Sequence, residues 1–281
     1  MKAWQRKIRE QRAAESLDSD LFGAWWKSET YSLDDCVVEE IGSKDAASII
    51  LKYEWLGSMP PFPWRSFGLR HKDSLLAASV FVSLKNGNVP YTLFHHRSVA
   101  LVRGASVHWA PANAASKLTQ GALRLIETSS PELDFAVAFV DSEAGEIGTI
   151  YQACGWRFLG WTTAHRWLAP NGVTFNPNYH RTFAWNTHGR GAGRKVTPQE
   201  IKAAELQLTS AGWRLVRAGS RGRYAAVLKS NRRDARPLVK LLEKHAKPYP
   251  KRESSEANAA TNAEARFDPA IPLQTMLEGK A

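Results

Sequence analysis

The fold is decided by residues 98–140, SVALVRGASVHWAPANAASKLTQGALRLIETSSPELDFAVAFV. An apolar run extends from Ser98 to Trp109, and a second one spans Phe135–Val140. Between them, residues 113–127 repeat apolar side chains at helical spacing. The residues on the expected buried face of this helix are Leu118, Ala122, Leu125 and Ile126. A helix between two buried strands implies a right-handed parallel crossover.

The segments around this unit predict the rest of the domain. Two strands precede it and are close enough to form an antiparallel meander. The expected strands are 37–41, 66–70, 75–84 and 156–163, the expected helices are 43–55 and 145–154, and residues 162–168 and 174–179 form a hairpin. This order predicts an α+β fold, a three-layer α/β/α domain with a mixed central sheet.

The charge of the chain is concentrated in one region. The net charge is +11 over 281 residues, and residues 188–252 hold 17 lysines and arginines against 4 acidic residues. Such a surplus attracts nucleic acid because it neutralises phosphates and releases their counterions. A solvated surface is the alternative interpretation. Aromatic residues lie among the basic ones, namely Trp213, Tyr224 and Tyr249. They favour the nucleic-acid interpretation.

Composition therefore predicts four parts. They are a polar arm (1–30), the α+β domain (31–187), a small basic C-terminal module (188–252) and a disordered tail (253–281). Within the module we expect a helix that starts with the capping residues TPQE, a hairpin that turns at GSRG and a helix over 232–244. If the module is separate, truncation after residue 187 spares the fold.

The sequence argues against a disulfide-rich secreted protein, a zinc-stabilised protein and a membrane protein. Two cysteines, Cys36 and Cys154, make no disulfide framework and no zinc motif. The N-terminus is charged, unlike a signal peptide, and no apolar run reaches the ~20 residues that span a bilayer. We expect a cytoplasmic protein with no membrane partner.

Several motifs carry a resemblance to a known family. The run from Val102 to Ile126 resembles the acyl-donor-binding strand and helix of GNAT acyltransferases. The run FAVAFVDSEAGEIGTIYQACGWRFLG (135–160) resembles the next strand, helix and strand of that superfamily. Asp141 at the strand end, Gly-x-Ile-Tyr at 148–151 and Tyr-x-x-Leu-Gly at 53–57 point further, to the Mom family of phage DNA-modification proteins. The resemblance covers about residues 35–185 and implies a phage-encoded protein in a bacterial host.

The resemblance and helix physics together suggest a donor site. A helix N-terminus has unpaired N–H groups and a positive dipole end, so it binds phosphates. The expected donor-binding residues are Asn113, Ala114, Ala115, Ser116 and Lys117. Alanine and asparagine stand where GNAT proteins carry a glycine-rich loop, and a capped structural helix is the alternative. The expected donor is acetyl-CoA or another activated acyl or glycyl donor.

The same resemblance implies the catalytic residues. Asp141 and Tyr151 match together, with Asp141 or Glu54 as the expected base and Tyr151 as general acid to the leaving group. Asp141 as a helix cap and Tyr151 as a core aromatic are the alternatives. Glu54 and Tyr53 join the site from the corner at 53–57, with Ser116 beside them. The resemblance also implies iron. The spacing of His95, His96 and His108 is not that of metal ligands, so we predict no metal site.

Double-stranded DNA is the expected macromolecular partner. Trp55 and Trp64 flank a proline loop and could stack on a flipped base. The other expected contacts are arginines, namely Arg103, Arg221, Arg223, Arg232 and Arg233.

These observations predict an enzyme that attaches a carbamoylmethyl-type group to N6 of adenine in DNA and so protects it from restriction. Two other functions stay open. One is an acetyltransferase acting on a protein, a small amine or an aminoacyl-tRNA. The other is an inactive DNA-binding protein on a GNAT scaffold.

Overall fold

The structure, a computed structural model, describes residues 3–18, 32–60, 62–84, 97–175, 179–189 and 196–251. The chain divides into two compact units. The first comprises residues 1–162 and 221–255, and the second comprises residues 163–220 and 256–281. The predicted tail, 253–281, lies outside the described residues.

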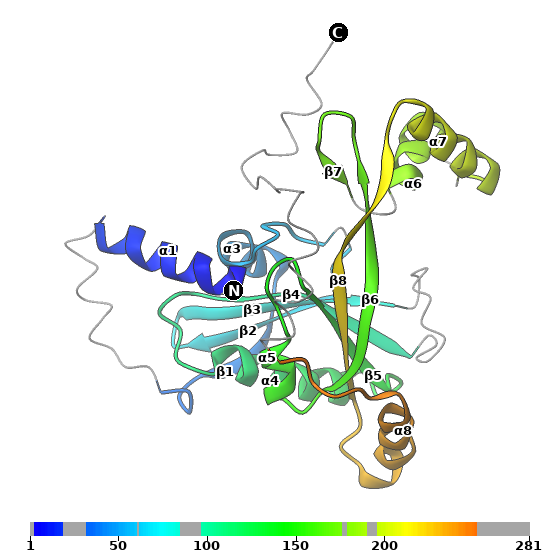
Figure 1. Cartoon of the computed structure of the whole chain (residues 1–281). Coiled ribbons are helices and arrows are strands. Elements are labelled where there is room, and N and C mark those ends of the chain that lie inside the picture. Colours follow the sequence, from blue (N-terminus) through cyan, green and yellow to red (C-terminus); the bar gives the residue numbers. More distant parts are fainter. Residues whose placement is uncertain are drawn as a thin grey trace. The chain divides into compact units, whose positions relative to one another are not determined.

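A mixed sheet organises the chain (Figure 1). Its strands are β1 (Val37–Ile41), β2 (Arg65–His71), β3 (Ser74–Ser83), β4 (Ser98–Ser106), β5 (Phe135–Asp141), β6 (Arg157–Leu168), β7 (Thr174–Phe175) and β8 (Arg214–Val227). They follow the order β1-β2-β3-β4-β5-β8-β6-β7. Strands β1 to β4 form the predicted antiparallel meander, and β4 pairs parallel to β5. The mixed α+β architecture is therefore confirmed.

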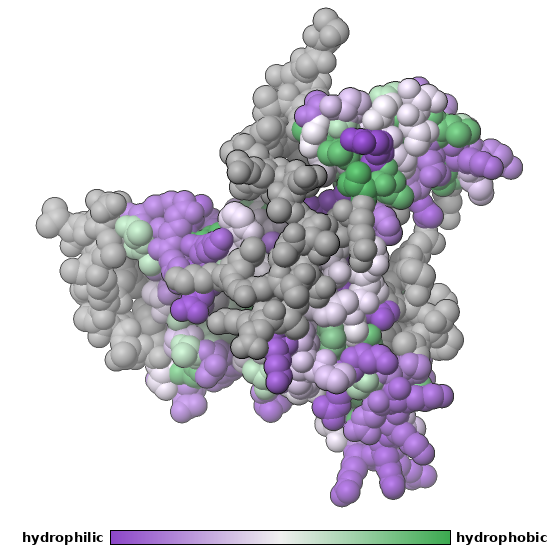
Figure 2. All heavy atoms as spheres, viewed as in Figure 1, coloured by the Kyte–Doolittle hydropathy of each residue, from purple (hydrophilic) through white to green (hydrophobic). Residues whose placement is uncertain are grey.

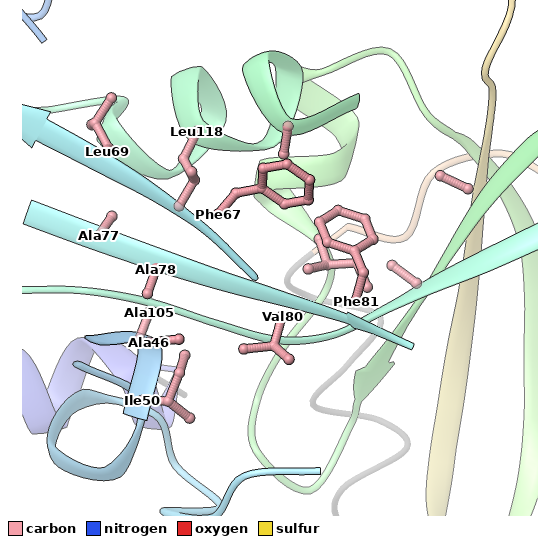
Figure 3. Packing of buried hydrophobic residues seen from close by; sticks show 14 of the residues in the cluster. Ala46, Ile50, Phe67, Leu69, Ala77, Ala78, Val80, Phe81, Ala105 and Leu118 are labelled. Atoms are coloured by element: carbon pink, nitrogen blue, oxygen red, sulfur yellow. The ribbon is translucent and has the colours of Figure 1, made fainter. Parts of the chain in front are cut away.

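Helices cover both faces of the sheet in the first unit. Helix α3 (Ser43–Tyr53) lies on one face and α4 (Ala114–Ser129), the predicted crossover helix, on the other. Figure 3 shows Ile50 of α3 beside Val80, and Leu118 of α4 directed towards Phe67. Successive strand residues point to opposite faces, so the side chains of β3 pack against the helices on both faces of the sheet. Gly121 lets α4 approach β1, since a Cβ there would lie 2.6 Å from Val38.

Three further helices belong to the first unit. Helix α1 (Trp4–Asp18) forms in the predicted polar arm, and α5 (Thr149–Ala153) follows β5. Helix α8 (Arg232–His245) packs Leu242 with Phe135 and Val137 in a second apolar cluster. In the described part of the chain, no helix is long and apolar enough to cross a bilayer.

The second unit contains β7, helix α6 (Tyr179–Ala184), a π-helical turn (Trp185–Gly189) and α7 (Pro198–Ser210). Strand β7 pairs with β6 as in the predicted hairpin, but Tyr179, the predicted end of that strand, begins α6 instead. The predicted capping box of α7 is present, with Thr197 and Glu200 bonded to each other's backbone. Tyr179 stacks on Trp213 with their ring centroids 5.1 Å apart, so aromatic contacts hold this unit together.

The predicted hairpin at GSRG is wrong. Residues 214–227 form one strand, and β8 pairs antiparallel with β5 from Val227↔Phe135 to Arg221↔Asp141. The glycine that suggested a turn serves packing instead, because a Cβ at Gly222 would lie 2.7 Å from Val140 and 2.9 Å from Trp161.

The predicted boundary at residue 188 therefore does not separate the compact units. Part of the expected basic module supplies β8 to the central sheet, between β5 and β6. Truncation after residue 187 would remove that strand and leave the backbone groups of β5 unpaired on one side. Such a truncation is therefore expected to disrupt the fold.

Candidate functional site

The two parallel strands separate at one end of the sheet. Pairing between β4 and β5 runs from Ser98↔Phe135 to Leu101↔Ala138 and stops there, although β4 continues to Ser106 and β5 to Asp141. A bulge in β4 follows at once, because Leu101 pairs with Phe81 and Arg103 with Val80. Ligands of open α/β sheets bind at the carboxyl ends of such strands.

Glu54 lies buried near this end of the sheet. It is 6% exposed, and its Oε2 accepts a hydrogen bond of 2.9 Å from the Leu56 N–H. Arg103 Nε lies 3.9 Å from the same oxygen, but its shorter bond, 2.7 Å, goes to the Ser58 carbonyl. Loss of solvation on burial therefore outweighs the attraction of the Arg103 charge, and the pKa of Glu54 rises to about 7.

Glu146 and Tyr151 complete a group of interacting acids. Glu146 lies in the loop between β5 and α5, and Tyr151 lies on α5. Burial raises the pKa of Glu146 to about 8, and the charge of Glu54 contributes. Burial also raises the pKa of the Tyr151 hydroxyl, and both glutamates contribute. Three acids from distant parts of the chain thus act on one another, and we name Glu54, Glu146 and Tyr151 the acid cluster.

Asp141 holds the turn that carries Glu146. Its Oδ1 accepts the Glu143 N–H at 2.9 Å, and its carbonyl accepts the Glu146 N–H at 3.2 Å. The Asp141 N–H in turn donates to the Glu146 carboxyl. Asp141 therefore caps a turn and not the next helix, whose N-cap residue is Gly148, so the helix-cap alternative is wrong.

Tyr224 of β8 supports the same loop from the sheet. Its hydroxyl donates to the Ile147 carbonyl at 2.5 Å and accepts from Gln152 Nε2 at 3.0 Å. The Tyr224 ring is fully buried, and its centroid lies 5.3 Å from that of Tyr151. Burial raises the pKa of Tyr224 to about 12, so this hydroxyl stays protonated and keeps donating.

The predicted donor site lies at the start of α4. Asn113 adopts a left-handed conformation, φ 65°, and its side chain makes no capping hydrogen bond. The Asn113 side chain therefore caps none of the N–H groups of the first turn, although the Ala114 N–H donates to the Pro111 carbonyl at 3.2 Å. Lys117 does not join them, because its Nζ donates to the Leu33 carbonyl.

Tyr53 lies apart from the carboxyl of its neighbour Glu54. The Tyr53 hydroxyl is 3.3 Å from His108 Nδ1, and Arg9 of α1 donates to the His108 carbonyl. Within the described ranges, no three His, Cys, Asp or Glu side chains are grouped to hold a metal ion. This donor set does not fit iron. His95 and His96 lie outside the described residues.

The predicted DNA contacts have different local surroundings. Arg103 holds the Ser58 loop, and Arg223 donates to the Leu159 carbonyl at 3.0 Å. Trp55 and Trp64 are half-buried, and the guanidinium of Arg65 lies over the Trp64 ring. The remaining candidates, Arg221 on β8 and Arg232 and Arg233 on α8, are exposed.

The model of the Mom protein family matches residues 35–251. The chain belongs to this family. No curated protein matches the sequence.

Solved acetyltransferase structures also resemble this Mom-family chain at low identity. An IAA acetyltransferase from Bacillus cereus is 10% identical, with a TM-score of 0.36 and coverage of 68% of this chain and 99% of its own. An N-acetyltransferase from Staphylococcus aureus is 12% identical, with a TM-score of 0.38 and coverage of 69% and 99%. A GNAT family acetyltransferase from Elizabethkingia anophelis, with acetyl-CoA bound, is 7% identical, with a TM-score of 0.36 and coverage of 69% and 99%.

Two residues of the Mom-family site carried no local signal in the sequence. Glu146 resembles an ordinary loop glutamate, and Tyr224 one of several aromatics in a basic segment. Both acquire their roles through tertiary contacts: Glu146 through lost solvation and the charge of Glu54, and Tyr224 through the pairing of β8 with β5. A strand prediction across residues 214–227 would have been the first step towards Tyr224.

Proposed function

We propose that this Mom-family protein is a transferase that adds a small acyl-derived group, of the carbamoylmethyl type, to the N6 amine of adenine in DNA. The acid cluster is the observation that carries this proposal. Groups whose pKa values lie near neutrality, held at the ends of diverging strands, suit enzymes that move protons. The resemblance to Mom proteins supplies the substrate, adenine in DNA.

The chemistry of adenine requires such groups. The lone pair of the N6 amine is delocalised into the ring, which makes the amine a poor nucleophile. Attack therefore needs removal of a proton from the nitrogen and a donor with a good leaving group. In this proposal a carboxylate of the acid cluster takes the amine proton, and Tyr151 protonates the leaving group.

The start of α4 is the proposed site for an anionic donor such as a coenzyme A thioester. Ala115 and Ser116 would offer backbone N–H groups and the positive end of the helix dipole to its phosphates. When bound, a thioester would supply an activated carbonyl carbon, and attack on that carbon gives an N6-acyl group. Transfer of a carbamoylmethyl group would instead require a donor that is activated at its CH2 carbon. Cys154 packs behind this turn, with its Sγ 3.6 Å from the Ser116 carbonyl.

A row of basic side chains on α8 supports DNA as the partner. Arg232, Arg236, Lys240 and Lys244 recur every fourth residue and are exposed. At 1.5 Å per residue the row is about 18 Å long, roughly the rise of five phosphates on one strand. Figure 2 shows this part of the molecule as strongly hydrophilic. The opposite face of α8 packs Leu238 and Leu242 into the protein, which fixes the row in place.

The test is mass spectrometry of nucleosides from total DNA of cells that express the protein. The matched variants are Tyr151→Phe, which removes the hydroxyl of the acid cluster, and Tyr179→Phe, which removes a hydroxyl of the second unit. We expect a new adenosine-derived mass with the wild type and with Tyr179→Phe, and its loss with Tyr151→Phe. The mass itself identifies the transferred group.

Unmodified nucleosides in cells that contain soluble, folded protein would contradict the proposal. Binding and turnover of acetyl-CoA by the purified protein would then favour an acetyltransferase with a protein, small amine or aminoacyl-tRNA as acceptor. DNA binding without either activity would favour the inactive scaffold.

A further inference from the structure

The loop between α3 and β2 exposes one large apolar side chain. We call residues 57–64, GSMPPFPW, the proline loop. Its Phe62 is 84% exposed, more than any other large apolar side chain in the described part of the chain. Keeping a phenyl ring in water costs free energy that burial would recover. The ring of Phe62 is therefore available to a partner that buries it.

Hydrogen bonds fasten the proline loop to the protein on both sides of Phe62. Before it, Arg103 Nε donates to the Ser58 carbonyl at 2.7 Å. After it, the Trp64 N–H donates to the Phe81 carbonyl of β3 at 2.8 Å. The exposed ring thus lies between two anchored ends of a short loop.

Packing and prolines stiffen the same loop. Met59 packs against the main core, and Pro60 is buried. Pro63 fixes its own φ and restricts Phe62, the residue before it, to extended backbone. A loop that is already ordered loses little conformational entropy when it binds. Phe62 is therefore presented in advance of binding.

The base of the proline loop belongs to the candidate functional site. The Leu56 N–H donates to the Glu54 carboxyl at 2.9 Å. Arg103, which holds Ser58, lies on β4 beyond the last residue that pairs with β5. The loop therefore starts at the end of the sheet where the two parallel strands separate, and Phe62 follows Ser58 by four residues.

An adenine inside a duplex does not offer its N6 amine to such a site, because the amine is paired and the base is stacked. Enzymes that react with a base turn it out of the stack. Proteins that deform DNA insert apolar side chains, Phe among them, between base pairs. Trp55 and Trp64, which were predicted to stack on a flipped base, are half-buried, so Phe62 is the aromatic residue of this segment that is exposed enough to insert.

We propose that Phe62 is a wedge that inserts into the base stack of duplex DNA and holds open the step from which the target adenine leaves. The inference rests on the proposed modification of adenine in DNA. The charge of the segment suits this partner. Residues 55–64 contain no acidic residue, and Lys52 just before them is exposed, so this segment does not repel phosphates.

The first experiment compares Phe62→Ala with Phe62→Leu and with Leu206→Ala by nucleoside mass spectrometry of DNA from expressing cells. Leu206 is a matched control, because it is 60% exposed on α7. Contact of one aromatic side chain with a base contributes roughly 5- to 150-fold. We expect Phe62→Ala to lose modified adenosine about fivefold or more. Phe62→Leu should stay within about twofold of the wild type, because leucine also serves as a wedge, and so should Leu206→Ala.

The second experiment needs no chemical turnover and no known target sequence. Closed circular plasmid is relaxed by a topoisomerase while the full-length protein is bound, and the protein is then removed. A wedge between base pairs unwinds the duplex, so the plasmid keeps negative supercoils. At equal plasmid binding we expect this unwinding with the wild type, Phe62→Leu and Leu206→Ala, and its loss with Phe62→Ala.

Two results would overturn the inference: a wild type that binds plasmid without unwinding it, and a Phe62→Ala variant that unwinds as much as the wild type. If the loop instead docks on a second copy of this chain, Phe62→Ala would weaken self-association and leave unwinding unchanged, which also overturns it. Unmodified nucleosides together with unwinding that depends on Phe62 would support the wedge and count against the proposed chemistry alone.

Discussion

Gly148, at the start of α5, offers a sharp test of how the acid cluster is supported. Its φ is +73°, a conformation that costs an L-residue about 1–2 kcal/mol. A Cβ there would also lie 2.4–2.8 Å from three atoms of the Tyr224 side chain, two of the ring and the hydroxyl oxygen. That ring is fully buried, and its hydroxyl is bonded to the Ile147 carbonyl, so it has little room to move.

The expected cost of Gly148→Ala is the sum of both effects. Overpacking a rigid site adds about 1–3 kcal/mol to the backbone cost, so the free energy of unfolding should fall by about 2–5 kcal/mol. Gly155→Ala is the matched control at the other end of α5. Its φ is +75°, but no atom lies within 4 Å of the added Cβ, so it should cost only about 1–2 kcal/mol.

Urea unfolding followed by tryptophan fluorescence measures both variants. The excess cost of Gly148→Ala over Gly155→Ala should disappear in a Tyr224→Leu background, because the ring that the Cβ meets is gone. Equal costs for the two alanine variants, within about 0.5 kcal/mol, would refute the reasoning. An excess that persists without the tyrosine ring would refute it as well.

Three further outcomes follow from the structure. Burial raises the folded-state pKa values of Glu54 and Glu146 above 4.5, so the folded protein binds more protons than the unfolded chain, and urea midpoints should fall as pH rises from about 5 to 8. Glu146→Gln should flatten this fall, by an amount of the order of 3 kcal/mol; an unchanged slope would contradict the burial of this carboxyl. Thr197→Ala removes the capping box of α7 and should cost about 1 kcal/mol, seen as faster amide exchange in its first turn, whereas unchanged exchange would show that the cap is dispensable. Arg236→Glu and Lys240→Glu should each weaken binding to any duplex sequence and reduce the salt dependence of binding by about one phosphate contact; an unaltered salt slope would remove α8 from the DNA surface.

Local patterns predicted much of the domain. The helical repeat in residues 113–127 and the apolar runs on either side of it correctly predicted α4 between the parallel strands β4 and β5. The capping residues Thr197 and Glu200 correctly predicted the start of α7. These features depend on neighbouring residues, whose spacing and side-chain types are visible in the sequence.

Pairing between distant segments was not predictable in this way. The glycines of residues 214–227 indicated a turn, yet Gly222 serves the close packing of Val140 and Trp161 inside a continuous strand. Which segment pairs with β5 depends on burial of both faces of the sheet, and no local pattern encodes that.

The same distinction between local patterns and distant contacts applies to the candidate site. The sequence by itself determined the strand–helix–strand unit, the basic character of the α8 segment, and Glu54, Asp141 and Tyr151 as candidate acids. Only the tertiary structure decided that the charge of Glu54 acts on Glu146 and that Tyr224 holds the loop of Glu146. The physical reason is that a carboxyl group acquires an unusual pKa from lost solvation and nearby charge, and both come from residues far away in the chain.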